Sequence, residues 1–412
     1  MLNENRFPTR HALPSVMMRS GTSKGLFIHK EHLPRDHSKW GQVLISVMGS
    51  QQGDQKQLDG VGGGTSTTSK VAIVSKSSRP DADVDYTFAQ IAVGKGQVDF
   101  SGNCGNMACG VGPFALDEGL VQPLPGQTSI DVRVFNTNTK RLLVETMEVG
   151  FDGRFNEFGH FRIGGVKSEG SEIKVAFVDP AGSMTRKLLP TGNAQDIVTV
   201  SSLPALGQFS VRASLVDAAN PFVFLDASTL PSVYHLLGPD APETLEVIEA
   251  IRQEAAVLYC LAKSTAEASQ VRGTPKIAVL SSSPDSSAEV RTINVQSFSM
   301  GKPHPSLQLT GGVCLGAALC TEGTIANQFA GEFDRMTPPG TPPNELQAVD
   351  LVTGKGASES VIRIKHRSGE MDVLVQTKSN GSGGSEIEKV SISRTARRLF
   401  EGNVYYSTED LK

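Results

Sequence analysis

Two stretches of this chain are almost free of charge, yet their composition is typical of helices. One runs from Asn106 to Glu118 and the other from Gly311 to Glu322, and both are rich in Ala, Gly, Val, Leu and Cys. A helix that is apolar on all sides must be buried. Each stretch follows a loop of small residues and ends in an acidic residue followed by glycine. The pattern predicts two similar domains, each wrapping strands around one buried helix.

Most of the remaining chain has the pattern of short strands. Several segments alternate apolar and polar residues with the period of a half-buried strand. Further helices are expected over 36–48 and 240–263. Long alternation of strands and helices is missing, which argues against a doubly wound nucleotide-binding fold. The predicted strands are 71–75, 83–93, 130–136, 173–178, 211–216, 276–280, 360–365 and 371–376.

Composition narrows the function classes. With 412 residues, 38% of them hydrophobic, the chain can form two domains with real cores. The net charge of −4 and the lack of a basic tract argue against nucleic acid or anionic membranes as partners. No apolar run is long enough to span a bilayer, and the N-terminus has no signal-peptide core. Five scattered cysteines, without zinc-site spacing, predict a reduced, cytoplasmic protein with no metal.

The loop Ser101–Asn106 is the first candidate for chemistry. It places Cys104 between glycines at the expected start of a buried helix. Helix N-termini favour anions, including the thiolate form of a cysteine. Cys104 is therefore expected to be the most reactive of the five cysteines. The alternative interpretation is a buried structural cysteine in a tight turn.

The loop Gly60–Lys70 is the second candidate. Three consecutive glycines and then five hydroxyl residues precede Lys70, which leads into an apolar strand. The order of residues is not that of a phosphate-binding P-loop. Burial would favour the neutral amine of Lys70, which could then act as a general base. The alternative is a flexible surface loop with a solvated lysine.

Two more loops share this composition of small hydroxyl residues, glycines and cations. They are Met18–Gly25 and Met300–His304, and a surface turn is the alternative interpretation of the second. Taken together, the four loops suit a small di- or tricarboxylate. No metal cluster, nucleotide fingerprint or Ser-His-Asp signature competes with this interpretation.

Ordered motifs over essentially the whole chain resemble the PrpF family. This family includes 2-methylaconitate isomerases, methylitaconate isomerases, 4-oxalomesaconate tautomerases and fungal aconitate Δ-isomerases. The motifs are Met18–Gly25, Gly62–Lys70, Gly102–Asn106 with Val111–Phe114, Asp179–Ser183 with Leu189–Asn193, Asp217–Pro221 and Arg394–Gly402.

The resemblance implies the fold class α+β, with a diaminopimelate-epimerase-like fold of two similar domains, each a curled mixed β-sheet around a central buried helix. The first domain would cover residues 1–182, joined by the returning segment 395–412, and the second would cover 183–394. Epimerases of this fold have a cysteine at the entrance to each central helix. Cys104 matches the first, but Thr310 stands at the second, which argues against a two-thiol amino-acid racemase.

The resemblance also implies an activity without cofactor or metal. Lys70 and Cys104 would be the acid–base pair for an allylic proton shift in an unsaturated polycarboxylate. Cis-aconitate, converted to trans-aconitate, is the expected substrate because the chain resembles the fungal members more than the bacterial ones. The alternatives are a 2-methylaconitate isomerase, a 4-oxalomesaconate tautomerase or a non-catalytic carboxylate-binding protein. A homodimer is a further expectation. The expected substrate-binding residues are Thr22, Ser23, Ser66, Thr67, Asn103, Gly105, Asn106, Lys302, His304 and Thr310.

Overall fold

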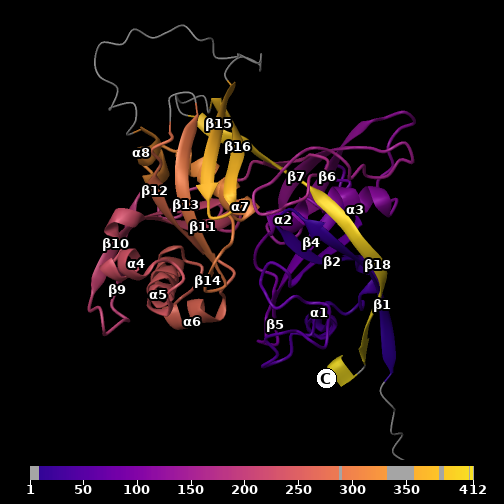
Figure 1. Cartoon of the computed structure of the whole chain (residues 1–412), viewed down its shortest axis with the longest axis horizontal. Coiled ribbons are helices and arrows are strands. Elements are labelled where there is room, and N and C mark those ends of the chain that lie inside the picture. Colours follow the sequence, from indigo (N-terminus) through magenta and orange to yellow (C-terminus); the bar gives the residue numbers. More distant parts are fainter. Residues whose placement is uncertain (1–8, 287–289, 332–356, 380–384, 408, 412) are drawn as a thin grey trace, which may run out of the picture.

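The computed structural model describes residues 9–286, 290–331, 357–379, 385–407 and 409–411, and it consists of two halves that lie side by side (Figure 1). The first half contains β1 (Arg10–Ser20), β2 (Ser23–His29), β3 (Lys70–Lys76), β4 (Val84–Ala92), β5 (Gln97–Asp99), β6 (Ser129–Asn136), β7 (Arg141–Glu148) and β8 (Ile173–Val178). The second contains β9 (Asp196–Val200), β10 (Phe209–Ala218), β11 (Asn220–Asp226), β12 (Lys276–Ser282), β13 (Arg291–Ser299), β14 (Lys302–Pro303), β15 (Ala357–His366), β16 (Gly369–Ser379) and β17 (Ser385–Arg394).

The two halves repeat one pattern of strand pairing. In the first, the order β1-β2-β3-β4-β6-β7-β8 is joined by antiparallel, parallel, antiparallel, parallel, antiparallel and antiparallel pairings. In the second, the order β10-β11-β12-β13-β15-β16-β17 shows the same series. Antiparallel pairing of β8 with β17 joins the halves into one continuous mixed sheet. The topology therefore places corresponding strands at corresponding positions in both halves.

A buried helical segment lies inside each half, as the charge-free stretches predict. In the first half it is broken into α2 (Gly105–Ala108) and α3 (Val111–Asp117) around Gly110, and in the second it is α7 (Leu309–Leu319). Every residue of α7 is buried. Gly312 and Gly316 allow close packing, because a Cβ on Gly312 would come within 3 Å of side chains on β16 and β17, and a Cβ on Gly316 would come within 3 Å of side chains on β16.

In each half, other helices cover the face of the sheet that points away from the buried helix. In the first half α1 (Trp40–Met48) packs on it, and in the second α5 (Pro242–Leu258) packs with α4 (Ser232–Leu237) and α6 (Thr265–Gln270). Helix α8 (Ile325–Gly331) follows α7. Because β3 and β12 are covered on both faces, they are apolar runs rather than alternating strands. Among the described residues, none of the helices is long and apolar enough to cross a membrane.

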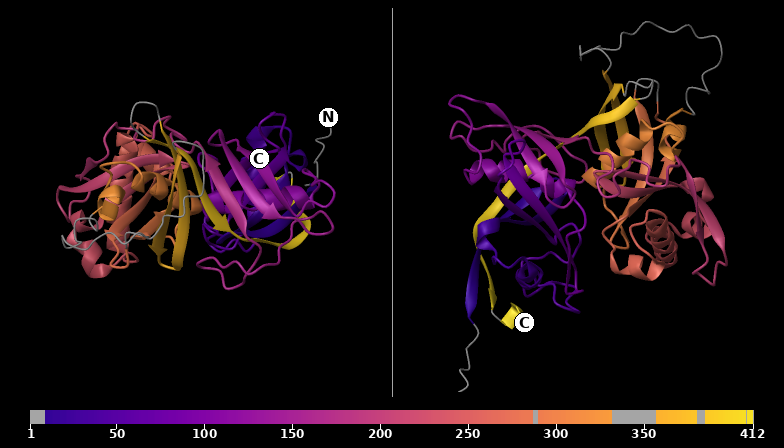
Figure 2. Two further views of the ribbon diagram at one scale, coloured as in Figure 1. Left: turned by 90° about the horizontal axis from the view of Figure 1, so that it is seen from above. Right: turned by 180° about the vertical axis from the view of Figure 1, so that it is seen from behind.

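The last strand returns to the first half. β18 (Ala396–Ser407) leaves the second half after Arg394 and pairs antiparallel with β1, with Arg10 opposite Ser407. Figure 2 shows this yellow strand beside the indigo β1 when the molecule is seen from behind. The first half therefore depends on residues from both ends of the described chain.

Candidate functional site

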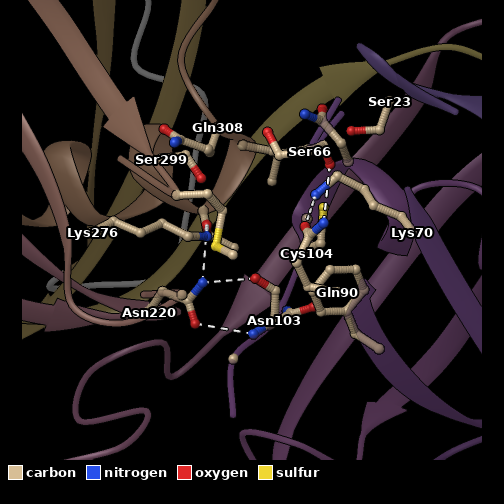
Figure 3. Close-up of a pocket in the computed structure, with 18 of the residues that line it drawn as sticks. Ser23, Ser66, Lys70, Gln90, Asn103, Cys104, Asn220, Lys276, Ser299 and Gln308 are labelled. Carbon is tan, nitrogen blue, oxygen red and sulfur yellow. Dashed lines mark hydrogen bonds between the residues drawn. The ribbon is translucent and has the colours of Figure 1, made fainter. Parts of the chain in front are cut away.

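A pocket lies where the first turns of α2 and α7 meet. A Cβ on Gly105 would come within 2.6 Å of Leu309 Cδ2, so only glycine permits this approach of the two helices. Both halves line the pocket (Figure 3). The first half contributes Ser23, Ser66, Lys70, Phe88, Gln90, Asp99, Gly102, Asn103, Cys104, Gly105 and Asn106, and the second contributes Asn220, Gly273, Lys276, Ser299, Met300, His304, Gln308, Leu309 and Thr310.

Lys70 opens β3, and its side chain is buried with 8% of its surface exposed. Its Nζ donates to Gln90 Oε1 (2.5 Å), while Gln90 Nε2 donates to the carbonyl oxygens of Ser69 (3.0 Å) and Ser66 (3.2 Å). These bonds fix the orientation of the Gln90 amide. Within the described residues, no carboxylate lies within ion-pair distance of Lys70. The lysine is therefore free to meet an anionic ligand.

Cys104 precedes α2 and is the only one of the five cysteines that lines this pocket. Burial raises the pKa of the Cys109 thiol to about 12 and also raises the pKa of Cys314 well above its usual value. Those two are core residues. The expectation that Cys104 is the most reactive cysteine needs correction, because Cys104 is only 9% exposed whereas Cys260 is exposed.

A network of amides holds the loop before α2. The Asn220 side chain makes two hydrogen bonds to the backbone of Asn103, and Asn136 Nδ2 donates to Asn103 Oδ1 (3.2 Å). Asn106 Nδ2 donates to Thr22 Oγ1 (3.0 Å), and Arg394 Nε donates to Asn106 Oδ1 (3.4 Å). The loop that carries Cys104 is thus fixed from both halves of the molecule.

The structure brings together most of the residues predicted from sequence. Seven of the expected binding residues line the pocket with Lys70 and Cys104: Ser23, Ser66, Asn103, Gly105, Asn106, His304 and Thr310.

Three expected binding residues lie elsewhere. Lys302, on the two-residue strand β14, does not line the pocket, because its side chain is exposed to solvent. The hydroxyl of Thr67 lies 3.0 Å from that of Thr65, outside the lining. Thr22 lines a neighbouring cavity of about 400 Å³, and its hydroxyl accepts a hydrogen bond from Asn106, which lines the pocket.

His304 lines the pocket but is not a cation at neutral pH. Burial lowers the pKa of its imidazole to about 3, and its Nδ1 lies 2.5 Å from the carbonyl oxygen of Ser306. The ring therefore offers neutral hydrogen-bonding groups rather than charge.

Sequence reasoning missed Lys276, which opens β12 and lines the pocket from the second half. Figure 3 shows its side chain on the opposite side of the pocket from Lys70. Its Nζ donates to Thr310 Oγ1 (3.4 Å). Burial lowers the pKa of this lysine to about 8. The signal was in the sequence, because Lys276-Ile-Ala-Val-Leu-Ser281 repeats the pattern of Lys70-Val-Ala-Ile-Val-Ser75.

The pocket suits a small polyanion. Two lysines line it, together with neutral amides, hydroxyls and backbone N–H groups. Asp99 is its single carboxylate among the described lining residues, and Asp99 Oδ1 accepts hydrogen bonds from Ser101 N (2.7 Å) and Oγ (2.5 Å). Among the residues that the structure places, no group of three metal-ligating side chains is found.

Comparison with known proteins gives a consistent result. The family model described as PrpF protein matches residues 10–338 and 347–407. The chain is 34% identical to the 4-oxalomesaconate tautomerase of Pseudomonas putida, covering 95% of each chain, and 32% identical to the 2-methyl-aconitate isomerase of Shewanella oneidensis, covering 98% of this chain and 99% of that one. A crystal structure of methylitaconate-delta-isomerase superimposes with a TM-score of 0.67 at 33% identity, covering 98% of this chain and 97% of the other. The chain therefore belongs to the PrpF family, and like these relatives it is an isomerase.

Proposed function

We propose that this isomerase moves the double bond of an unsaturated polycarboxylate by an allylic proton shift, with Lys70 and Cys104 as the acid–base pair. The substrate we propose is cis-aconitate, converted to trans-aconitate. The observation that carries the proposal is that Lys70 and Cys104, on different elements, line one pocket with a second lysine and several amides. The compounds named for the relatives are all unsaturated polycarboxylates, which supports the class of substrate.

The chemistry follows from the positions of these groups. A base removes a proton from the CH₂ carbon beside a carboxylate, and the electron pair spreads over the allylic system and the carboxylate oxygens. Reprotonation at the other end of the system moves the double bond, and rotation before reprotonation exchanges cis and trans forms. Nearby hydrogen-bond donors stabilise the charge of this intermediate. The proposed reaction needs no cofactor.

We also propose the diaminopimelate-epimerase-like arrangement, with a first domain of 1–182 plus 395–412 and a second of 183–394. The repeated pairing order and the buried helix in each half support it.

A panel of substrates tests the function. Purified protein is incubated in heavy water with cis-aconitate, 2-methylaconitate and 4-oxalomesaconate, and in ordinary water with an α-deuterated amino acid, and each compound is followed by NMR. We expect isomerisation and deuterium incorporation with cis-aconitate, and neither with Lys70→Ala. Faster turnover of 2-methylaconitate or 4-oxalomesaconate would show that this compound, and not cis-aconitate, is the preferred substrate. Loss of α-deuterium from the amino acid would indicate an epimerase, and no exchange with any compound would indicate a carboxylate-binding protein.

A further inference from the structure

The second half carries a counterpart of the Lys70 position. Lys276 follows Lys70 by 206 residues, and Thr310 follows Cys104 by the same 206. Each lysine is the first residue of the strand that pairs parallel with the preceding strand of its half, Lys70 opposite Gly25 and Lys276 opposite Phe222.

Each lysine also lies near an aromatic ring, although the two rings are on strands at different positions of their halves, Phe88 on β4 and Phe222 on β11. Lys70 Nζ lies 5.2 Å from the ring centre of Phe88, and Lys276 Nζ lies 5.8 Å from that of Phe222. The two lysines reach the same pocket from opposite sides (Figure 3).

We propose that Lys276 is a second catalytic residue, whose ammonium group binds a substrate carboxylate across the pocket from Lys70 and stabilises the negative charge of the allylic intermediate. This inference rests on the proposed function. When Lys70 takes the proton, the electron pair of the broken C–H bond moves onto the allylic system and its carboxylate. No bond forms to Lys276, and the added charge disappears when a proton returns to the other carbon.

The difference between the two halves explains this division of roles. Lys70 shares its side of the pocket with Cys104, whose thiol can give up a proton. Lys276 donates instead to the hydroxyl of Thr310, which is a far weaker acid. The second half therefore has the charge and hydrogen-bond donors to hold an anion, but it lacks the thiol that would complete a second proton-transfer pair.

The charged and titratable groups around Lys276 set its pH dependence. Burial and the nearby Lys70 disfavour its ammonium form, while Cys104, Asp99 and Cys314 favour it. His304 is neutral, and Arg272 pairs with Glu249 (3.8 Å). With a pKa of about 8, the empty site loses the ammonium form as the pH rises through that value. A bound polyanion restores it, so binding at about pH 8.5 should take up a proton.

The test uses Lys276→Met, Lys276→Arg and, as a control, Lys174→Met at an exposed position of β8. Calorimetry with tricarballylate, a saturated tricarboxylate that cannot isomerise, is run at about pH 8.5 in two buffers of different ionisation enthalpy. Wild type and Lys174→Met should take up a proton on binding, and Lys276→Met should not and should bind at least ~10-fold more weakly. In turnover, Lys276→Met should lose ~10²-fold in kcat/KM. In wild type, kcat/KM should fall as the pH rises and Lys276 loses its proton. Lys276→Arg stays cationic, so it should recover part of the lost kcat/KM and should not show this fall at high pH.

Unchanged affinity and proton uptake in Lys276→Met would overturn the assignment. A fall in kcat/KM at high pH that persists in Lys276→Arg would overturn it as well. Calorimetry needs no turnover, so it distinguishes this failure from that of the proposed function, which would appear as wild-type protein inactive on every substrate. Thermal unfolding of each variant checks that it is folded.

Discussion

The side-chain amide of Asn220 binds both backbone groups of Asn103 across the boundary between the two halves. Its Oδ1 accepts from the N–H of Asn103 (3.1 Å), and its Nδ2 donates to the carbonyl oxygen of the same residue (2.7 Å). Asn220 opens β11, and Asn103 directly precedes Cys104. This one side-chain amide thus fixes the position of Cys104 relative to Lys276 and Thr310 of the second half.

Replacing this amide by a carboxylate should damage both stability and activity. Asn220→Asp keeps the size and one acceptor but loses the donor to Asn103, so a buried carbonyl is left facing a carboxylate. We expect the free energy of unfolding to fall by about 1–3 kcal/mol and kcat to fall about tenfold as Cys104 loses its position. Denaturant unfolding and steady-state kinetics measure these effects. Asn403→Asp, at an exposed position of β18, should change neither.

Removal of the Lys70 amine should abolish most turnover without unfolding the protein. Lys70→Ala is expected to lose at least ~10²-fold in kcat, the usual scale for a general acid or base. Lys76→Ala, at the exposed end of the same strand, is the matched control. Near-normal turnover by Lys70→Ala would remove this residue from the mechanism.

In alkylation experiments, Cys104 should be distinguished from the other thiols by protection with bound substrate and not by its rate of reaction. Cys260 is exposed and should react with iodoacetamide first, whereas Cys104 should react more slowly from inside the pocket. A bound tricarboxylate should block labelling of Cys104 and leave Cys260 unaffected, as followed by mass spectrometry. Cys104→Ser should reduce turnover more than affinity, because a hydroxyl transfers a proton less readily than a thiol. If substrate gives no protection, Cys104 is a structural residue.

The free energy of unfolding should decrease as the pH rises, because the buried carboxyl group of Glu145 then ionises. Glu145 is fully buried on β7, where it accepts one hydrogen bond from Gly112 N (2.9 Å), and burial raises its pKa to about 8. Because the folded pKa lies above the unfolded value, the stabilisation is complete below about pH 4.5 and is lost up to about pH 8, with a limiting slope of about 1.4 kcal/mol per pH unit. Thermal unfolding of Glu145→Gln should lack this dependence. Glu148→Gln, at the exposed end of β7, should keep it.

Lys302 provides a negative prediction. Since its side chain is exposed and outside the pocket lining, Lys302→Ala should leave kcat and KM within about twofold of wild type. A rise in KM of tenfold or more would show that β14 moves toward the substrate when it binds.

The buried helices and the loops with Lys70 and Cys104 could be predicted because their composition is unusual over many residues. The role of Gln90 could not be predicted, since Gln90 reaches Lys70 because the register of β3 with β4 places the two residues opposite each other. Lys302 lies outside the pocket lining, and the sequence could not show this because the composition of a turn does not reveal the direction of its side chains. Lys276 could have been found from its repeated strand motif, but a lysine on a strand attracts attention only once that strand is known to end at the pocket.

The pairing of β1 with β18 has a consequence for synthesis of the protein on the ribosome. β1 is translated before every other described strand, yet its partner β18 is translated almost 400 residues later. Until then β1 has an unpaired edge that other chains can join, and closing so long a loop is slow. The first half can therefore complete its sheet only after all strands of the second half have been made. Nascent chains stalled before β18 should be the aggregation-prone species and the ones that bind chaperones.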